Sequence, residues 1–166
     1  MAIDELADRL ATAAAGIEAL HPAVAAGEPW PLSDDYGTEP ESAWGPKEVL
    51  AHVAEMLPYW LGQVETILAS PSGAGPPPFG RVATDEKRLY RIGADRRLPA
   101  SELVDQIGES AATVRARLLA LMPAELERSA VHPRLGEMTV PAIYERFIIG
   151  HLEEHVRQLG EVLGRS

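Results

Sequence analysis

The 166-residue chain contains no cysteine, which excludes disulfides, thiolate metal ligands and a cysteine nucleophile. Histidine and carboxylate side chains are therefore the only good metal ligands left. Long apolar runs are also missing: no stretch approaches the roughly 20 residues needed to span a bilayer, so no membrane partner is expected. The N-terminal "MAIDELADRL" begins with acids and not with the basic residues of a signal peptide. These absences make a cytoplasmic location the default expectation.

Basic charge is scarce. The chain holds 15 Lys and Arg against 25 Asp and Glu, for a net charge of −10, and residues 1–70 alone hold 12 acids and two bases. Nucleic-acid binding requires a basic face, because phosphate neutralisation supplies most of the non-specific affinity. The composition therefore argues against a nucleic-acid partner, and the acidic surface is interpreted as one that keeps the protein in solution.

Apolar residues recur at helical spacing in four long segments. The first begins at about residue 3 and ends in the middle twenties, and a shorter basic segment lies between the second and third. The later long segments are 45–69, 99–122 and 140–164, and the short one is 84–97. No convincing strand or internal repeat appears. The sequence therefore predicts an all-α four-helix bundle in a single domain, 1–166, with long connecting loops and a short extra helix.

Proline marks the ends and the weak points of these helices. Pro46 and Pro141 fit the first turn of their helices, where the missing amide is not needed. Pro58 lies inside the second helix and is expected to bend or break it locally, and Pro22 is expected to interrupt the first. Thr139 is a good N-cap for the last helix.

Three connections lack helical periodicity. Residues 70–80, "SPSGAGPPPFG", are expected to be irregular, and 132–140, "HPRLGEMTV", to form an extended link. Residues 27–44 form a long, turn-rich connection. A connection of this length is often functional or packed by its own side chains, which here are Trp30, Tyr36 and Trp44.

Two histidines four residues apart, His151 and His155, lie in the apolar segment "FIIGHLEEHVRQLG". With 3.6 residues per turn they fall about 40° apart, at the centre of the apolar stripe. The same construction places His52 on the inner face of the second helix. Three of the five histidines therefore point into the bundle, from two helices that can be neighbours.

Two interpretations of these histidines compete. Burying imidazoles side by side costs free energy unless each finds a partner, and a shared cation satisfies them together. The alternative is that they are ordinary core histidines with ordinary hydrogen bonds. The inward pair favours a tri-histidine metal site, and three neutral imidazoles leave open coordination positions, as in catalytic zinc sites. Zinc and nickel both suit imidazole ligands.

The stretch "HLEEH" also fits the H-x-x-E-H pattern of a class of zinc proteases. Glu154 would then act as general base, and its helical position near the rim of the inward face allows this. Such proteases take a further glutamate ligand well downstream, whereas only residues 156–166 follow His155. An ordinary surface glutamate is the favoured interpretation, with the protease as a lesser alternative.

Three segments, taken in order, carry a family resemblance. They are "WGPKEVLAHVAEML" on the second helix, "HPRLGEMTV" before the last helix and "GHLEEHVRQLGEV" on it. The ordered set resembles the DinB-like family of four-helix-bundle metalloenzymes over nearly the whole chain. Gly45 departs from the family pattern, in which serine or threonine precedes the proline; this affects the helix start and not the site.

The resemblance implies an up-down-down-up bundle with a divalent metal, zinc or nickel, held by His52, His151 and His155. Related proteins include thiol-dependent S-transferases and a mycothiol-dependent maleylpyruvate isomerase. The implied function is a metal-dependent transferase, isomerase or hydrolase that acts on a small-molecule substrate, with a low-molecular-weight thiol as a candidate cofactor. A non-catalytic bundle that binds a metal or small ligand is the alternative. A homodimer is also expected, because such bundles often pair through exposed helix faces.

The two remaining histidines are interpreted as peripheral. His132 lies in the extended link and is expected to face solvent, with a role as fourth ligand as the alternative. His21 is expected at the surface or at a helix cap. The residues that follow His52 on its helix either line a pocket or pack in the core; these are Tyr59, Trp60 and Gln63.

One local concentration of basic residues surrounds the short helix. It is interpreted as a solvated helix face interleaved with acids. The alternative is that it attracts a carboxylate-bearing cofactor, because arginine pairs with carboxylates through two parallel hydrogen bonds. The cluster comprises Arg81, Lys87, Arg88, Arg91, Arg96 and Arg97.

Overall fold

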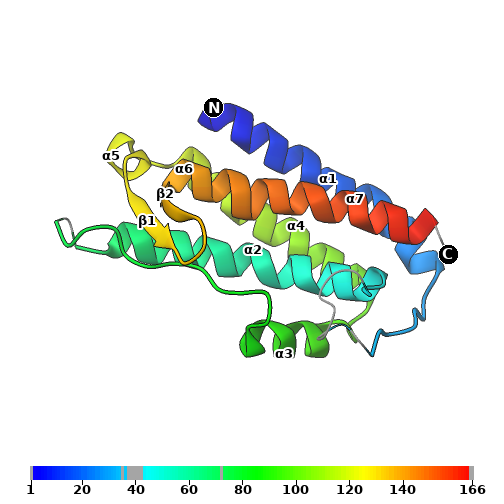
Figure 1. The fold of residues 1–166 in the computed structure, drawn as a ribbon. Helices are drawn as coiled ribbons and strands as arrows, with labels where there is room; N and C mark the ends of the chain where they lie inside the picture. The colour runs from blue at the N-terminus through cyan, green and yellow to red at the C-terminus, as the bar shows by residue number, and fades with distance from the viewer. Residues whose placement is uncertain (1, 35, 37–42, 72, 165–166) are drawn as a thin grey trace.

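The computed structural model describes residues 2–34, 36, 43–71 and 73–164. Its long helices are α1 (Ile3–Ala26), α2 (Pro46–Ala69), α4 (Ala100–Leu119) and a C-terminal run of α6 (Val140–Ile143), η1 (Tyr144–Ile149) and α7 (Gly150–Gly164). Both α1 and α2 pack against α4 and α7. Figure 1 shows α1 and α7 running in one direction and α2 and α4 in the other. The predicted all-α, up-down-down-up bundle is confirmed.

The predicted short helix is α3 (Glu86–Asp95), which packs against α2. Its first turn is capped by Asp85, whose Oδ1 accepts a hydrogen bond from the Arg88 amide at 2.9 Å. A further single turn, α5 (Pro123–Leu126), follows α4.

The prolines behave as expected at the helix starts, and those inside the helices do not interrupt them. Pro46 and Pro141 lie in the first turns of α2 and α6. Helix α2 continues through Pro58 and α1 through Pro22, so neither proline ends its helix. Thr139 occupies the N-cap position of α6, yet its side chain makes no capping hydrogen bond.

The link before the last helix is a β-hairpin and not a simple extended segment. Strand β1 (Ser129–His132) pairs antiparallel with β2 (Gly136–Thr139). The proline-rich segment bonds to strand β1 of this hairpin. The Val131 amide donates to the Pro77 carbonyl at 2.9 Å, and the Phe79 amide donates to the Val131 carbonyl at 3.1 Å. These bonds fix residues 77–79 beside the hairpin, although the segment itself is irregular as expected.

The helix that carries His151 and His155 contains a π-helical segment, η1. The Gly150 amide bonds to the Glu145 carbonyl, five residues back, and so the turn holds one residue more than an α-turn. A regular α-helix would place Ile149 about 160° from His151 and therefore outward. Ile149 is instead fully buried. The extra residue widens the buried face just before the histidine pair.

The connection between α1 and α2 is packed by its own aromatic residues, as far as it lies within the described part of the chain. The Trp30 indole donates to the Val24 carbonyl at 2.7 Å, and the Tyr36 hydroxyl reaches the Leu89 carbonyl of α3 at 3.4 Å. Trp44 is buried. Residues 35 and 37–42 of this connection lie outside the described residues.

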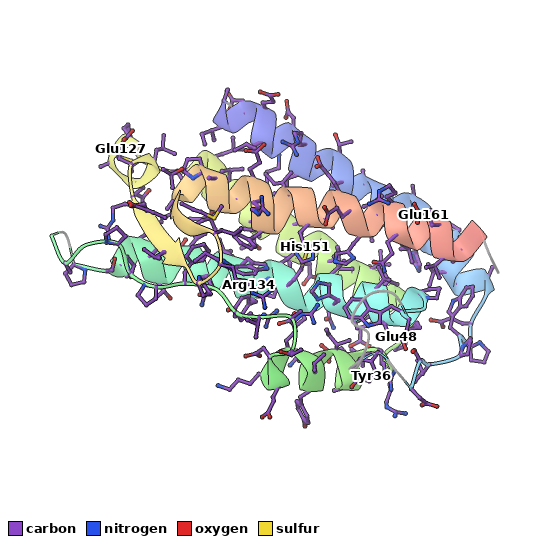
Figure 2. The ribbon with its side chains drawn as sticks, viewed as in Figure 1. Tyr36, Glu48, Glu127, Arg134, His151 and Glu161 are labelled. Carbon is purple, nitrogen blue, oxygen red and sulfur yellow. The ribbon has the colours of Figure 1, made fainter. Side chains whose placement is uncertain are left out.

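A buried ion pair fastens this connection to the start of α2. Glu48 is fully buried, and its Oε1 accepts hydrogen bonds from the Ser33 amide at 2.6 Å and from Nη1 of Arg96 at 2.9 Å. The Arg96 guanidinium also lies 4.1 Å from the centre of the Tyr36 ring. Figure 2 shows Glu48 and Tyr36 at the end of α2 nearest α3. The connection is thereby fixed to α2 at Glu48, one helical turn before His52.

Within the described residues, no helix combines the length and the apolar character that crossing a bilayer requires.

Candidate metal centre

The structure brings His52, His151 and His155 together in the interior of the bundle. Nε2 of His52 lies 3.4 Å from Nε2 of His151, and one ring nitrogen of each histidine lies within 4.8 Å of those of the other two. The ring centres are 4.6 to 5.1 Å apart. His52 and His155 are almost completely buried, whereas His151 is partly exposed. Figure 2 shows His151 between α7 and α2.

The spacing of these nitrogens can be compared with that of ligands around a tetrahedral cation. Imidazole nitrogens bound to zinc at about 2.0–2.1 Å are roughly 3.4 Å apart. The separation between His52 and His151 already has this value. With neutral rings, two facing Nε2 atoms without a proton between them would repel each other, and a shared cation removes that repulsion. The donor set is thus suited to a divalent first-row metal.

Each imidazole also contacts a polar group outside the cluster. Nδ1 of His155 lies 2.7 Å from Oε1 of Gln158, and His151 makes a hydrogen bond to the backbone of Phe147. Nδ1 of His52 lies 3.7 Å from Oε2 of Glu55. Outer partners of this kind set the tautomer and the orientation of metal-binding histidines.

Two buried ring nitrogens of the cluster, Nδ1 of His52 and Nε2 of His155, have no hydrogen-bond partner among the described residues, and the second faces the other histidines. The amide oxygen of Gln158 accepts from Nδ1 of His155, which leaves Nε2 of that ring as an unprotonated acceptor. This atom is buried and has no hydrogen-bond partner among the described residues. A buried acceptor without a partner costs about 1–3 kcal/mol. A cation at the centre of the cluster would satisfy it.

Burial keeps the three rings neutral, the form that binds metals. It lowers the pKa of His151 from 6.5 to about 3 and lowers the pKa values of His52 and His155 in the same direction. The positive charge of Arg88 is a smaller cause that acts on all three.

Two outer partners were not predicted, although a signal for them is present. Glu55 and Gln158 each stand three residues after a clustered histidine, in "HVAE" and "HVRQ". Residues three apart share a helix face, so either side chain can reach back to the histidine ring. Trp44 was also missed as a neighbour of the cluster. Its ring centre lies 5.2 Å from that of His52 and 6.3 Å from that of His155.

A cavity of about 150 Å³ adjoins the cluster on the side of α3. Its polar lining consists of His52, His151, Arg81 and Arg88, and Trp60 and Phe147 form much of its apolar wall. Its remaining lining residues are Val82 and Ala83. Of the three residues after His52 that were considered for a pocket, Trp60 lines it. Gln63 accepts a hydrogen bond from the Gly80 amide instead, and Tyr59 lies beneath the Arg81 guanidinium.

A second, larger pocket of about 640 Å³ lies on the other side of His151. Phe147 and His151 line both spaces and so stand between them. Glu154 is exposed and lines the outer pocket together with Arg146. No glutamate joins the histidine cluster within the residues that the structure covers, and so the zinc-protease alternative gains no support.

The prediction for His132 was wrong. This residue is buried, with its ring stacked on Phe147 at 5.0 Å and in edge contact with Phe79 at 5.4 Å. Its Nδ1 accepts a hydrogen bond from the Arg134 amide at 3.2 Å. It stands apart from the three clustered histidines and belongs to an aromatic group beside them. Its burial comes from the folding of residues 77–79 along the hairpin.

The interpretation of the basic cluster as a solvated face was wrong for half of its members. Lys87, Arg91 and Arg97 are exposed. Arg88 and Arg96 are buried, and the side chain of Arg81 is only 10% exposed. The last three point inward because each finds an interior acceptor: Arg88 the Ala83 carbonyl, Arg96 the Glu48 carboxylate and Arg81 the Glu55 carboxylate.

Comparison with known proteins identifies the family. No curated protein and no solved structure gives a significant match to the chain. The family model described as the DinB superfamily matches residues 2–159, which includes all three clustered histidines and all of the long helices except the last turn of α7. The fold and the family match agree, and the chain belongs to the DinB superfamily.

Proposed function

We propose that His52, His151 and His155 hold a divalent metal ion, zinc or nickel, and that the protein is a metal-dependent enzyme acting on a small substrate. The observation that carries the proposal is the convergence of three inward-facing, neutral imidazoles on one point, two of them buried, each close to an outer polar group. Ordinary core histidines need no such convergence, because both nitrogens of each ring would form separate hydrogen bonds.

An open coordination position supports catalysis over a purely structural role. Three histidine ligands leave at least one position free on a four-coordinate metal. His151 is partly exposed and lines both the inner cavity and the outer pocket, so a small molecule in either space would lie beside the cluster. A cation held there would act as a Lewis acid and would lower the pKa of a coordinated water or thiol. A low-molecular-weight thiol is therefore a candidate co-substrate for a transfer or isomerisation reaction.

The first test compares two buried histidines. We expect His52→Ala to lower zinc affinity by more than about 100-fold, since loss of an outer partner alone costs roughly 10–100-fold. His132→Ala removes another buried ring, from the neighbouring aromatic group, and should leave one zinc per chain. Metal content after purification without chelators, and competition with a chromogenic chelator, provide the measurement. Equal zinc affinity in both variants would remove His52 from the site.

The second test concerns the outer partner of His155. Gln158→Leu removes the acceptor that orients this ring, and we expect zinc affinity to fall by about 10–100-fold. Gln106→Leu on α4, remote from the cluster, is the control. Unaltered affinity in the Gln158 variant would show that the glutamine does not position a ligand.

Access to the metal separates a catalytic centre from a structural one. Azide added to the cobalt-substituted protein should change the visible spectrum if a coordination position is open. A spectrum that azide and small thiols leave unaltered would favour the non-catalytic bundle.

A further inference from the structure

We propose that Glu55 and Arg81 adjust the metal affinity of the histidine cluster in opposite directions. Glu55 strengthens it by accepting a hydrogen bond from Nδ1 of His52, and Arg81 weakens it by competing for the same carboxylate. The proposal rests on the metal centre proposed above and concerns the regulation of that site. Both are positioning residues, because each acts on the metal through the His52 ring.

Glu55 is a buried carboxylate between two possible donors. It lies three residues after His52 on α2, on the same helix face, and its side chain is only 7% exposed. Oε1 lies 2.5 Å from Nη1 of Arg81, and Oε2 accepts a hydrogen bond from Nη2 of Arg81 at 2.6 Å. Oε2 also lies 3.7 Å from Nδ1 of His52, which is beyond hydrogen-bond distance. Arg81 therefore holds the carboxylate just short of the histidine.

The His52 ring lacks a partner on the side of Glu55. Its Nε2 faces the cluster, 3.4 Å from Nε2 of His151, so Nδ1 carries the proton when Nε2 binds a metal. Nδ1 is buried and has no hydrogen-bond partner among the described residues. Metal-binding histidines usually donate this second N–H to a carboxylate, a carbonyl or a water, which makes the ring a better ligand. A small approach of Glu55 would supply that partner.

Arg81 comes from outside the helices that carry the cluster. It lies in the segment between Phe79 and α3, and its guanidinium carbon lies 3.6 Å from the centre of the Tyr59 ring. While both nitrogens of its fork bind Glu55, the charges of the pair largely cancel. A longer Arg81 contact would leave the carboxylate free to approach His52 and to attract a cation there. The position of this segment thereby sets the metal affinity.

Zinc affinities of single and double variants test the competition. We expect Glu55→Leu to weaken zinc binding by about 10–100-fold, the usual cost of losing an outer partner. Glu55→Gln keeps an acceptor and should lose less. Arg81→Met should tighten zinc binding by about 2- to 10-fold, which corresponds to one additional ordinary hydrogen bond. In the Arg81→Met background, Glu55→Leu should cost more than it does in the unmodified protein.

Two further variants serve as controls. Arg81→Met leaves the Glu55 charge buried without its cation, so Arg81→Lys guards against a folding defect. Lysine keeps the charge but lacks the fork, and it should tighten zinc binding by a smaller factor. Glu65→Leu breaks the contact with Arg117 elsewhere on α2, more than three helical turns past His52, and should leave zinc affinity unaltered.

The ring N–H signal of His52 separates positioning from a general structural role. In the cobalt(II)-substituted protein, nuclear magnetic resonance detects the N–H protons of metal-bound histidines apart from the other protein signals. The His52 signal should move in Glu55→Leu, because its acceptor is lost, and should stay in place in Glu65→Leu. The N–H signals of the other two ligands should keep their positions in both variants.

Each outcome has one interpretation. An equal loss from Glu55→Leu with and without Arg81 would overturn the competition, as would weaker zinc binding in both Arg81 variants. An unmoved His52 signal in Glu55→Leu would overturn the role of Glu55. Failure of the unmodified protein to bind zinc would instead overturn the metal centre, and this inference with it.

Discussion

Metal-free protein is expected to lose stability steeply as the pH falls below 6.5, well before its carboxylates protonate. Burial lowers the pKa values of His52 and His155, and lowers that of His151 from 6.5 to about 3. In the unfolded chain the same rings protonate near 6.5. Below that pH the unfolded state binds protons that the folded state does not, and this favours unfolding.

The sign and the size of this effect follow from proton linkage. The stability that the neutral buried histidines contribute is fully present above pH 6.5. It is lost as the pH falls toward the folded pKa values, about 3 for His151. Each histidine costs up to about 1.4 kcal/mol per pH unit, and the three together up to about 4. Against a total stability of roughly 5–15 kcal/mol, two pH units are enough to unfold many domains of this size. Bound metal should oppose the loss for as long as it stays bound, because it binds the folded protein in preference to the unfolded chain.

Urea unfolding at several pH values between about 5 and 7 measures the slope. His151→Gln should reduce the part of the slope that the three clustered rings cause by about one third, since one of the three no longer titrates. His132 contributes in the same direction, because burial lowers its pKa too, so His132→Gln is a necessary reference. An unchanged slope in the His151 variant would mean that other groups cause the acid sensitivity.

Arg96→Met is expected to destabilise the protein by about 3–5 kcal/mol, because it leaves the buried Glu48 carboxylate without its cation. Glu48 is fully buried, and its contact with Nη1 of Arg96 measures 2.9 Å. The Ser33 amide alone would remain as a donor to this oxygen. An isolated buried charge is far more costly than the pair, so the loss should be close to that of a core deletion.

The double variant Glu48→Gln/Arg96→Met separates charge from packing. Glutamine keeps an acceptor for the Ser33 amide and carries no charge, so the double variant should recover much of the lost stability. Arg157→Met, which breaks an exposed pair with Glu161 in α7, should cost less than about 1 kcal/mol. Chemical denaturation gives all three values. A double variant no more stable than Arg96→Met would assign the loss to the packing of Arg96 on Tyr36.

Periodicity along the chain was enough to predict the four long helices and the inward direction of His52, His151 and His155. Both depend on which residues lie a turn apart on one helix, and 3.6-residue geometry determines that locally. The i, i+4 spacing of His151 and His155 places their rings together on any helix. The proximity of His52 to this pair required one further condition, that the helices carrying them are neighbours in the bundle.

Only the tertiary structure identified the surroundings of the cluster. Arg81 looked like a solvated charge, since its buried acceptor, Glu55, is distant in the sequence. Arg88 did so too, because its acceptor is a backbone carbonyl, that of Ala83, which leaves no signal in the sequence. His132 looked like a loop residue, because its burial depends on Phe79 and Phe147, which are distant in the chain. The π-helical segment η1 likewise follows from packing on the core, where one extra residue per turn lets Ile148 and Ile149 both be buried. Contacts between distant segments carry no local periodicity, and so they appear only when the chain has folded.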